Sequence, residues 1–156
     1  MDTFIAFLID WGYWGMFIAS LLAGSAFPFS SEVILLGLLH PSIGLNTTLC
    51  VLTATIGNTL GGMTCYSIGR AGKLEWIKKI FKVSEQRLQS MVKFLNKRSA
   101  FMAFFTFLPG LGTVIAITLG FLRSHIGVVT ISMFTGKLSR YIVVAMAAKG
   151  IFSYFA

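Results

Sequence analysis

The chain has 156 residues, of which 56% are hydrophobic and only 12% charged, and its formal net charge is +8. A soluble domain of this length carries about 25% charged residues, so the composition predicts a single domain within a membrane. The positive charge could suggest a nucleic-acid partner, but its distribution argues against one. Nine of the thirteen lysines and arginines fall between Arg70 and Arg98, beside apolar segments. Such a run is typical of a cytoplasmic loop under the positive-inside rule.

Residues 1–12 form a short lead-in before the first long apolar segment. They lack a basic n-region, so we do not expect a cleavable signal peptide. The aromatic residues Trp11, Tyr13 and Trp14 favour a place at the membrane interface.

The first apolar segment runs from Trp14 to Leu39, and Glu32 is its only ionisable residue. Pro28 lies near its middle, and Ser30 and Ser31 follow. Proline removes a backbone donor and breaks a helix. The freed backbone groups must then be satisfied by protein or by water in a cavity. An ionisable residue at membrane depth indicates a functional site, so this stretch is the first candidate.

A turn at His40-Pro41-Ser42 is expected next, followed by a continuous span over Leu45–Ile68. Its 24 residues would extend roughly 36 Å as a helix, enough to cross a membrane with some tilt. Small residues mark a face where another helix can approach closely: Gly57, Gly61 and Gly62. Asn58 lies near the middle of the span and needs hydrogen-bond partners there.

The segment Lys73–Arg98 is amphipathic and basic. Its first part carries an apolar stripe: Leu74, Ile77, Ile80 and Phe81. Ser84 is a candidate N-cap for a second helix, whose apolar face would comprise Leu88, Met91, Val92 and Leu95. Such a helix pair is expected on the membrane surface, where it favours anionic lipid. A solvated cytoplasmic hairpin without a lipid role is the alternative.

Ser99–Leu122 is a second broken apolar segment, with Pro109-Gly110 at its centre. A turn over Arg123–His125 leads into a last span, Ile126–Ala148. Lys137 and Arg140 lie near the middle of that span and share one helix face, because they are three residues apart.

The two halves follow one plan: a broken apolar segment, a short turn and an unbroken span. The turns Gly37–Gly44 and Gly120–Gly127 align, and Pro28 matches Pro109 within two residues of that register. If each broken segment is a re-entrant helical hairpin, the first opens outward and the second to the cytoplasm. The halves, about 13–69 and about 99–150, are then inverted repeats joined by the linker 70–98. Two kinked full spans remain the rival arrangement.

Under the hairpin arrangement, polar residues from both halves fall at a similar depth: Ser30, Ser31, Glu32, Asn58, Thr106, Thr113, Lys137 and Arg140. Ser30 or Ser31 could cap the helix start after Pro28, and Thr113 could line the start after Pro109-Gly110. Two cations and one carboxylate leave a positive site that suits a phosphate or carboxylate group.

We expect no cofactor and no metal, but proton coupling through Glu32 is considered, because burial favours the protonated carboxyl group. The alternative is a structural ion pair between Glu32 and Lys137 or Arg140, since charges in a bilayer do pair. The two roles are compatible, because such a pair can open when substrate arrives.

Three motifs resemble the DedA family, also called the SNARE-associated or VTT-domain family, and its short YqaA-like branch most closely. They are Phe27-Pro28-Phe29-Ser30-Ser31-Glu32, Gly57-Asn58-Thr59-Leu60-Gly61 with Tyr66-Ser67-Ile68-Gly69-Arg70-Ala71-Gly72, and Phe107-Leu108-Pro109-Gly110 with Gly120-Phe121. The resemblance covers residues from about 20 to 150. Thr106 and Gly112 stand where the family pattern has arginines, and Gly62 stands where an acidic residue is frequent. Lys137 and Arg140 could restore the missing charge.

The resemblance implies a multi-pass protein of the bacterial inner membrane. Its expected function is translocation of a lipid with an anionic head group, such as a polyprenyl phosphate or a phospholipid. A small-solute or ion transporter and a non-transporting membrane scaffold are the alternatives. An enzyme is not expected, because no motif combines a nucleophile with a base. The expected partners are membrane lipids, and the oligomeric state stays open.

Overall fold

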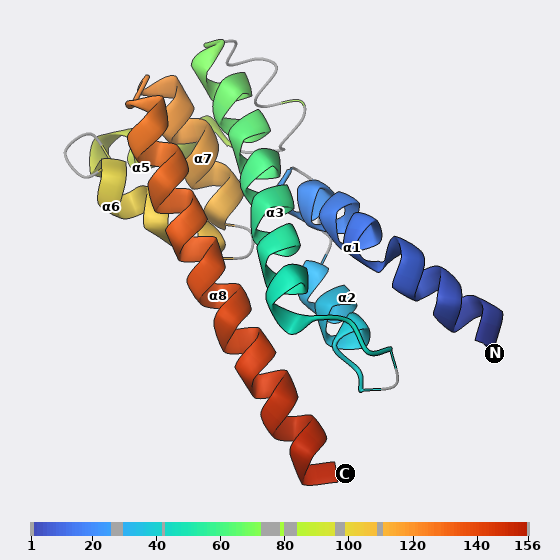
Figure 1. Cartoon of the computed structure of the whole chain (residues 1–156). Coiled ribbons are helices and arrows are strands. Elements are labelled where there is room, and N and C mark those ends of the chain that lie inside the picture. Colours follow the sequence, from blue (N-terminus) through green and yellow to red (C-terminus); the bar gives the residue numbers. More distant parts are fainter. Residues whose placement is uncertain are drawn as a thin grey trace.

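The computed structural model describes residues 2–25, 30–41, 43–72, 79, 84–95, 99–108 and 111–155. Over these residues the chain consists of helices joined by turns, with no strand, which confirms the all-α prediction. The elements, in chain order, are α1 (Asp2–Gly24), α2 (Ser31–Leu38), α3 (Thr47–Arg70), α5 (Glu85–Leu95), α6 (Ser99–Phe104), the 3₁₀ helix η1 (Phe105–Phe107), α7 (Leu111–Phe121) and α8 (Ile126–Phe155) (Figure 1).

Both predicted unbroken spans are helices, α3 and α8. α8 begins at Ile126 as predicted but continues to Phe155, beyond the expected end at Ala148. α5 begins directly after the predicted cap, Ser84. The expectation of a separate lead-in is wrong, because residues 2–12 are continuous with α1. No proline precedes Pro28, so nothing in that stretch interrupts the helix.

α1 and α3 lie in backbone contact. A Cβ added at Gly57 would overlap the carbonyl oxygen of Phe17, and one at Gly61 would overlap that of Leu21. Four residues further along α3, the contact on α1 also lies four residues further along, so the two helices run parallel. The predicted close approach is confirmed for these two glycines, which let the backbones meet. Gly62 instead faces α8.

α1 ends beside the middle of α3, where a Cβ at Gly24 would overlap the backbone of Asn58. Residues 26–29, including the predicted hairpin tip Pro28, lie outside the described residues. α2 then runs back along α1, because Leu38 at its end lies 3.6 Å from the Cβ position of Gly12.

α7 packs against the other end of α3, and α6 and η1 pack against α7 and α8 beside it (Figure 1). A Cβ at Gly120 would overlap the carbonyl oxygen of Tyr66, and one at Gly69 would overlap that of Ile117. α7 therefore runs along the C-terminal half of α3. Pro109-Gly110, the other predicted tip, lies outside the described residues.

α8 crosses the whole bundle beside α3 (Figure 1). The Tyr66 hydroxyl donates to the Ser124 carbonyl just before α8, whereas Asn58 meets Tyr141 much further along it. The two helices are therefore antiparallel. Two apolar cores flank this pair. One is built from Cys65, Tyr66, Ala103, Ile115, Ala116, Ile117, Leu119, Val129 and Met133. The other is built from Met16, Leu35, Leu38, Cys50, Val51, Ala54, Tyr141 and Ala145.

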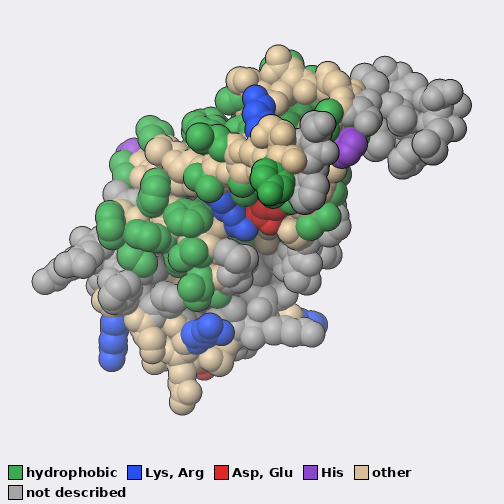
Figure 2. Space-filling view, turned by 90° about the horizontal axis from the view of Figure 1, so that it is seen from below, with side chains coloured by type: hydrophobic (Ala, Val, Ile, Leu, Met, Phe, Trp, Pro, Cys, Tyr) green, Lys and Arg blue, Asp and Glu red, His purple; other side chains and the backbone are tan. Residues whose placement is uncertain are grey.

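Apolar side chains also cover outer faces of the bundle, as the face in Figure 2 shows. On α8, Ile131, Val143 and Met146 each expose 65–69% of their surface. Among the described helices, α8 over Ile126–Ile151 is the one long and apolar enough to cross a membrane. An outward apolar surface of this kind suits contact with lipid.

Candidate functional site

Two consecutive residues at the start of α2 meet two consecutive residues in the middle of α8. The hydroxyl oxygens of Ser31 and Tyr141 lie 2.6 Å apart and share a hydrogen bond, and both residues are 2% exposed. Glu32 forms an ion pair with Arg140, and about a quarter of each of these side chains is exposed. The start of α2 is therefore fastened to α8 by one neutral and one ionic contact.

Ser30 lies at the N-cap position of α2, with an extended backbone at φ −95° and ψ 100°. Its side chain forms no capping hydrogen bond, so the predicted cap by Ser30 is wrong. The hydroxyl instead donates to Oε2 of Glu32 at 2.8 Å. A carboxylate is a stronger acceptor than a neutral group, which explains why the hydroxyl turns toward it.

Asn58 brings α3 into the same cluster. Its Nδ2 donates to the Tyr141 hydroxyl at 2.9 Å, and its backbone carbonyl accepts from the ammonium group of Lys137. The prediction that this amide needs hydrogen-bond partners near the middle of the span is confirmed. Tyr141 thus joins Ser31 of α2 to Asn58 of α3 through one oxygen atom.

Arg140 also reaches the second half of the chain, because its guanidinium donates to the carbonyl oxygen of Phe107 in η1. One side chain therefore bridges α2 and η1. The two halves approach each other again where the Thr113 hydroxyl lies 3.5 Å from the carbonyl oxygen of Ser25. That distance makes it a weak contact.

Thr106 does not join this cluster. It is 7% exposed, and its hydroxyl donates to the Ala103 carbonyl within its own turn at 2.7 Å. The structure thus brings together six of the eight predicted polar residues, places Thr113 near the contact between the halves and leaves Thr106 apart.

The charges in the cluster do not cancel. Glu32 pairs with Arg140, whereas Lys137 is 4% exposed and has no carboxylate partner within the described part of the chain. The predicted alternative of an ion pair is therefore observed with Arg140 and not with Lys137. With both basic side chains protonated, one formal positive charge remains, and it can attract an anion.

Sequence reasoning missed Tyr141 and the Phe107 carbonyl. Tyrosine in a membrane helix is expected at the interface, where its hydroxyl meets water. Tyr141 lies instead in the middle of its span, next to Arg140, and that position was the available signal. The Phe107 carbonyl carries no signal in the sequence, since every residue has one.

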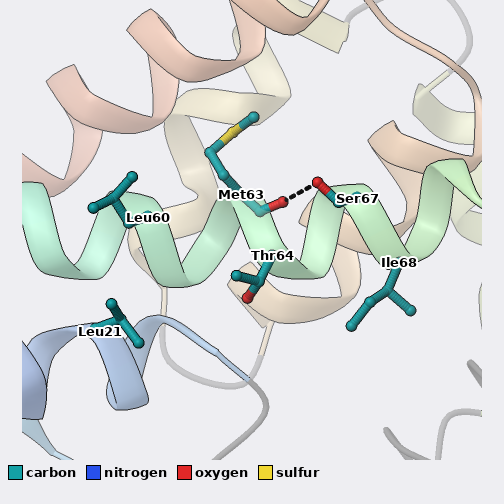
Figure 3. Close-up of a pocket in the computed structure, with 6 residues that line it drawn as sticks. All are labelled: Leu21, Leu60, Met63, Thr64, Ser67 and Ile68. Atoms are coloured by element: carbon teal, nitrogen blue, oxygen red, sulfur yellow. Dashed lines mark hydrogen bonds between the residues drawn. The ribbon is translucent and has the colours of Figure 1, made fainter.

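An apolar groove of about 480 Å³ lies along α3, beside the end of α1. Its lining residues are Leu21, Leu60, Met63, Thr64, Ser67 and Ile68 (Figure 3). Thr64 and Ser67 both use their hydroxyls within α3, to the carbonyls of Gly61 and Met63. Because these hydroxyls are satisfied, the groove presents mainly hydrocarbon.

One described helix of the bundle is long and apolar enough to cross a membrane, and relatives that are named membrane proteins support the class of a helical membrane protein. An uncharacterized protein of Haemophilus influenzae is 30% identical over 154 residues, which cover 91% of this chain and 93% of that protein. The inner membrane protein YqaA of Escherichia coli is 31% identical over 132 residues, which cover 85% of this chain and 87% of that protein. The uncharacterized membrane protein YkoX of Bacillus subtilis is 30% identical over 92 residues, which cover 56% of this chain and 42% of that protein.

The chain therefore belongs to the DedA family, in its YqaA-like branch. The family expected from the three motifs is thus confirmed, and with it a membrane location. No family model matches the chain. No solved structure matches it either.

Proposed function

We propose that this protein is a transporter that moves a lipid with an anionic head group across the bacterial inner membrane. The observation that carries the proposal is the cluster around Tyr141. It holds Lys137, Arg140 and Glu32 beside the middle of α3, with more positive than negative charge. Charges at such a position are costly in a bilayer and typically mark a substrate pathway.

The arrangement we propose is a pair of inverted repeats with re-entrant hairpins. Three contacts support it. α1 ends beside Asn58 and α2 returns toward Gly12, so the first segment turns at mid-length of α3. η1 reaches Arg140, and α7 returns along the C-terminal half of α3. The contact between Thr113 and Ser25 joins the two turning points.

Cysteine labelling tests this arrangement. We expect labels at Ser90 to react only from the cytoplasm, and labels at Asp2 and Ser42 to react only from outside. The native Cys50 and Cys65 are buried and can be kept. Opposite accessibility of positions 2 and 42 would mean that the first segment crosses fully, and it would remove the hairpin arrangement.

The groove beside the cluster favours a lipid over a soluble anion. Its lining residues on α3 lie within about three turns of Asn58, and most of the lining is apolar. Leu60, at its wall, is 46% exposed, so the groove opens on an outer face of the bundle. A head group at the cluster could therefore keep its hydrocarbon chain outside the polar site. A soluble solute would need no such side opening.

In this proposal Arg140 and Lys137 bind the anionic head group, and Ser30, Ser31 and Asn58 position the charged groups. Glu32 occupies Arg140 when no lipid is bound and leaves it when the head group arrives. A proton taken up by Glu32 would favour that release. The proposal includes no enzymatic step and no cofactor.

Reconstituted vesicles test the function. Fluorescently labelled phosphatidylglycerol and phosphatidylcholine would be followed from one leaflet to the other, with protein-free vesicles as the control. We expect the protein to speed the movement of phosphatidylglycerol, relative to protein-free vesicles, and to leave the movement of phosphatidylcholine unchanged. Uptake of inorganic phosphate without lipid movement would support a solute transporter, and no movement of either would support a scaffold.

A further inference from the structure

The ammonium group of Lys137 lies directly over a glycine. A Cβ added at Gly62 would lie 2.8 Å from Nζ of Lys137 and 3.2 Å from Sδ of Met133. Cβ atoms do not approach other atoms as closely as the first of these distances. The absence of a side chain at position 62 therefore leaves the space that the ammonium group occupies.

The preceding glycine has a different role, although it is adjacent in sequence. A Cβ at Gly61 would overlap the backbone of α1 at Leu21 and Gly24, which cannot move without separating the helices. The three atoms nearest to a Cβ at Gly62 lie toward the ends of two flexible side chains, Lys137 and Met133. A methyl group at position 62 thus displaces the charge of Lys137 and leaves the helix packing in place.

The position of this charge has a consequence for binding. Lys137 is 4% exposed and donates to the Asn58 carbonyl oxygen. That oxygen accepts a hydrogen bond from the ammonium group, but it carries no full negative charge that could neutralise the positive charge of Lys137. Buried charges are normally paired. The described carboxylate nearby, Glu32, is already bound to Arg140.

We infer that Gly62 sets the preference of the site for anionic head groups by seating Lys137 as an uncompensated cation. The inference rests on the proposed function and adds a residue that acts on selectivity. Gly62 touches no lipid itself. It works through Lys137, whose ammonium group contacts the phosphate of the head group.

A double-mutant cycle tests this inference in the full-length protein. Native mass spectrometry would measure the ratio of bound phosphatidylglycerol to bound phosphatidylcholine for the wild type, Gly62→Ala, Lys137→Met and the double variant. We expect each single variant to lower the ratio by about tenfold, the size of a lost charge-assisted hydrogen bond.

The double variant should show the same ratio as Lys137→Met. Methionine ends one atom short of Nζ, near the place of Cε, which lies 3.8 Å from the added Cβ in ordinary contact. The effects of the two changes are therefore not additive. The double variant should also unfold at a higher temperature than Gly62→Ala, since it removes the clash with the ammonium group. Gly61→Ala, the control, should lower the unfolding temperature in either background.

An unchanged ratio in Gly62→Ala, or effects that add in the double variant, would overturn the inference. Equal binding of both lipids by the wild type would overturn it as well. Binding is measured here without transport. A wild type that prefers the anionic lipid but moves none in vesicles would contradict the proposed function and leave the role of Gly62 standing.

Discussion

The short helices α2 and α7, one from each half of the chain, are held to the long helices α8 and α3 in different ways. In α2, three of eight residues are buried, and side-chain contacts from Ser31 and Glu32 fasten its start to α8. In α7, eight of eleven residues are buried, and Gly120 and Gly69 bring its backbone against α3. Polar contacts can be exchanged for contacts with a ligand, whereas close-packed backbones resist displacement. We therefore expect α2 to move during transport and α7 to stay in place.

The largest effect is expected from filling the backbone contact of α7. Gly120→Ala would place a Cβ on the Tyr66 carbonyl, and we expect destabilisation of about 1–3 kcal/mol or more. The matched control is Gly37→Ala in α2, where nothing lies within 4 Å of the added Cβ. That change should stabilise the helix slightly, by about 0.5–1 kcal/mol. Thermal unfolding in detergent measures both. Equal losses would mean that α2 is packed as closely as α7.

A smaller and more specific effect is expected at Tyr141. Tyr141→Phe removes the oxygen shared by Ser31 and Asn58. The buried Ser31 hydroxyl and the partly buried Asn58 amide then each have one partner fewer, at a cost of about 1–3 kcal/mol. Because Ser31 and Asn58 then position the charged groups less well, we expect slower lipid movement in vesicles. Tyr66→Phe is the control, because its hydroxyl bonds to the Ser124 carbonyl beside α7. Equal rates of lipid movement in Tyr141→Phe and Tyr66→Phe would contradict the expected difference between the contacts of α2 and those of α7.

The sequence predicted the helical class, the two long unbroken helices and the close approach at Gly57 and Gly61, because apolar length and small-residue spacing are local patterns. It also predicted that Glu32 would meet a cation. It could not choose between Lys137 and Arg140, which share a helix face. That choice depends on where α2 lies along α8, and this position follows from packing. The bond of Thr106 to the Ala103 carbonyl is different, because it is a local bond of a kind that threonine commonly forms within a helical turn.

The smallest effect for a single side chain is expected in the basic linker 70–98, which lies between the two halves of the chain. Changing Lys78, Lys79 and Lys82 to glutamine should weaken attraction to an anionic membrane by about 1 kcal/mol per charge. Of these residues, Lys79 is described and exposed. Lys78, Lys82 and the predicted apolar stripe, which is Leu74, Ile77, Ile80 and Phe81, lie outside the described residues. Nanodiscs of varied phosphatidylglycerol content would measure the change in the attraction of the linker to the membrane. An attraction that is unchanged by the substitutions would favour a solvated linker without a lipid role.

The central claim is that the pair of Glu32 with Arg140 works in transport and is not only a structural link. Breaking a fully buried pair costs about 3–5 kcal/mol. About a quarter of each side chain is exposed here, so the cost should be smaller and Glu32→Gln should fold. The amide keeps the shape of the side chain and loses the charge and the proton.

Thermal stability and lipid movement in vesicles should therefore be measured together for Glu32→Gln and for Glu32→Gln with Arg140→Met. We predict a stable, inactive single variant whose activity the second change does not restore. A destabilised single variant, with both stability and lipid movement recovered in the double variant, would contradict the role of Glu32 in transport.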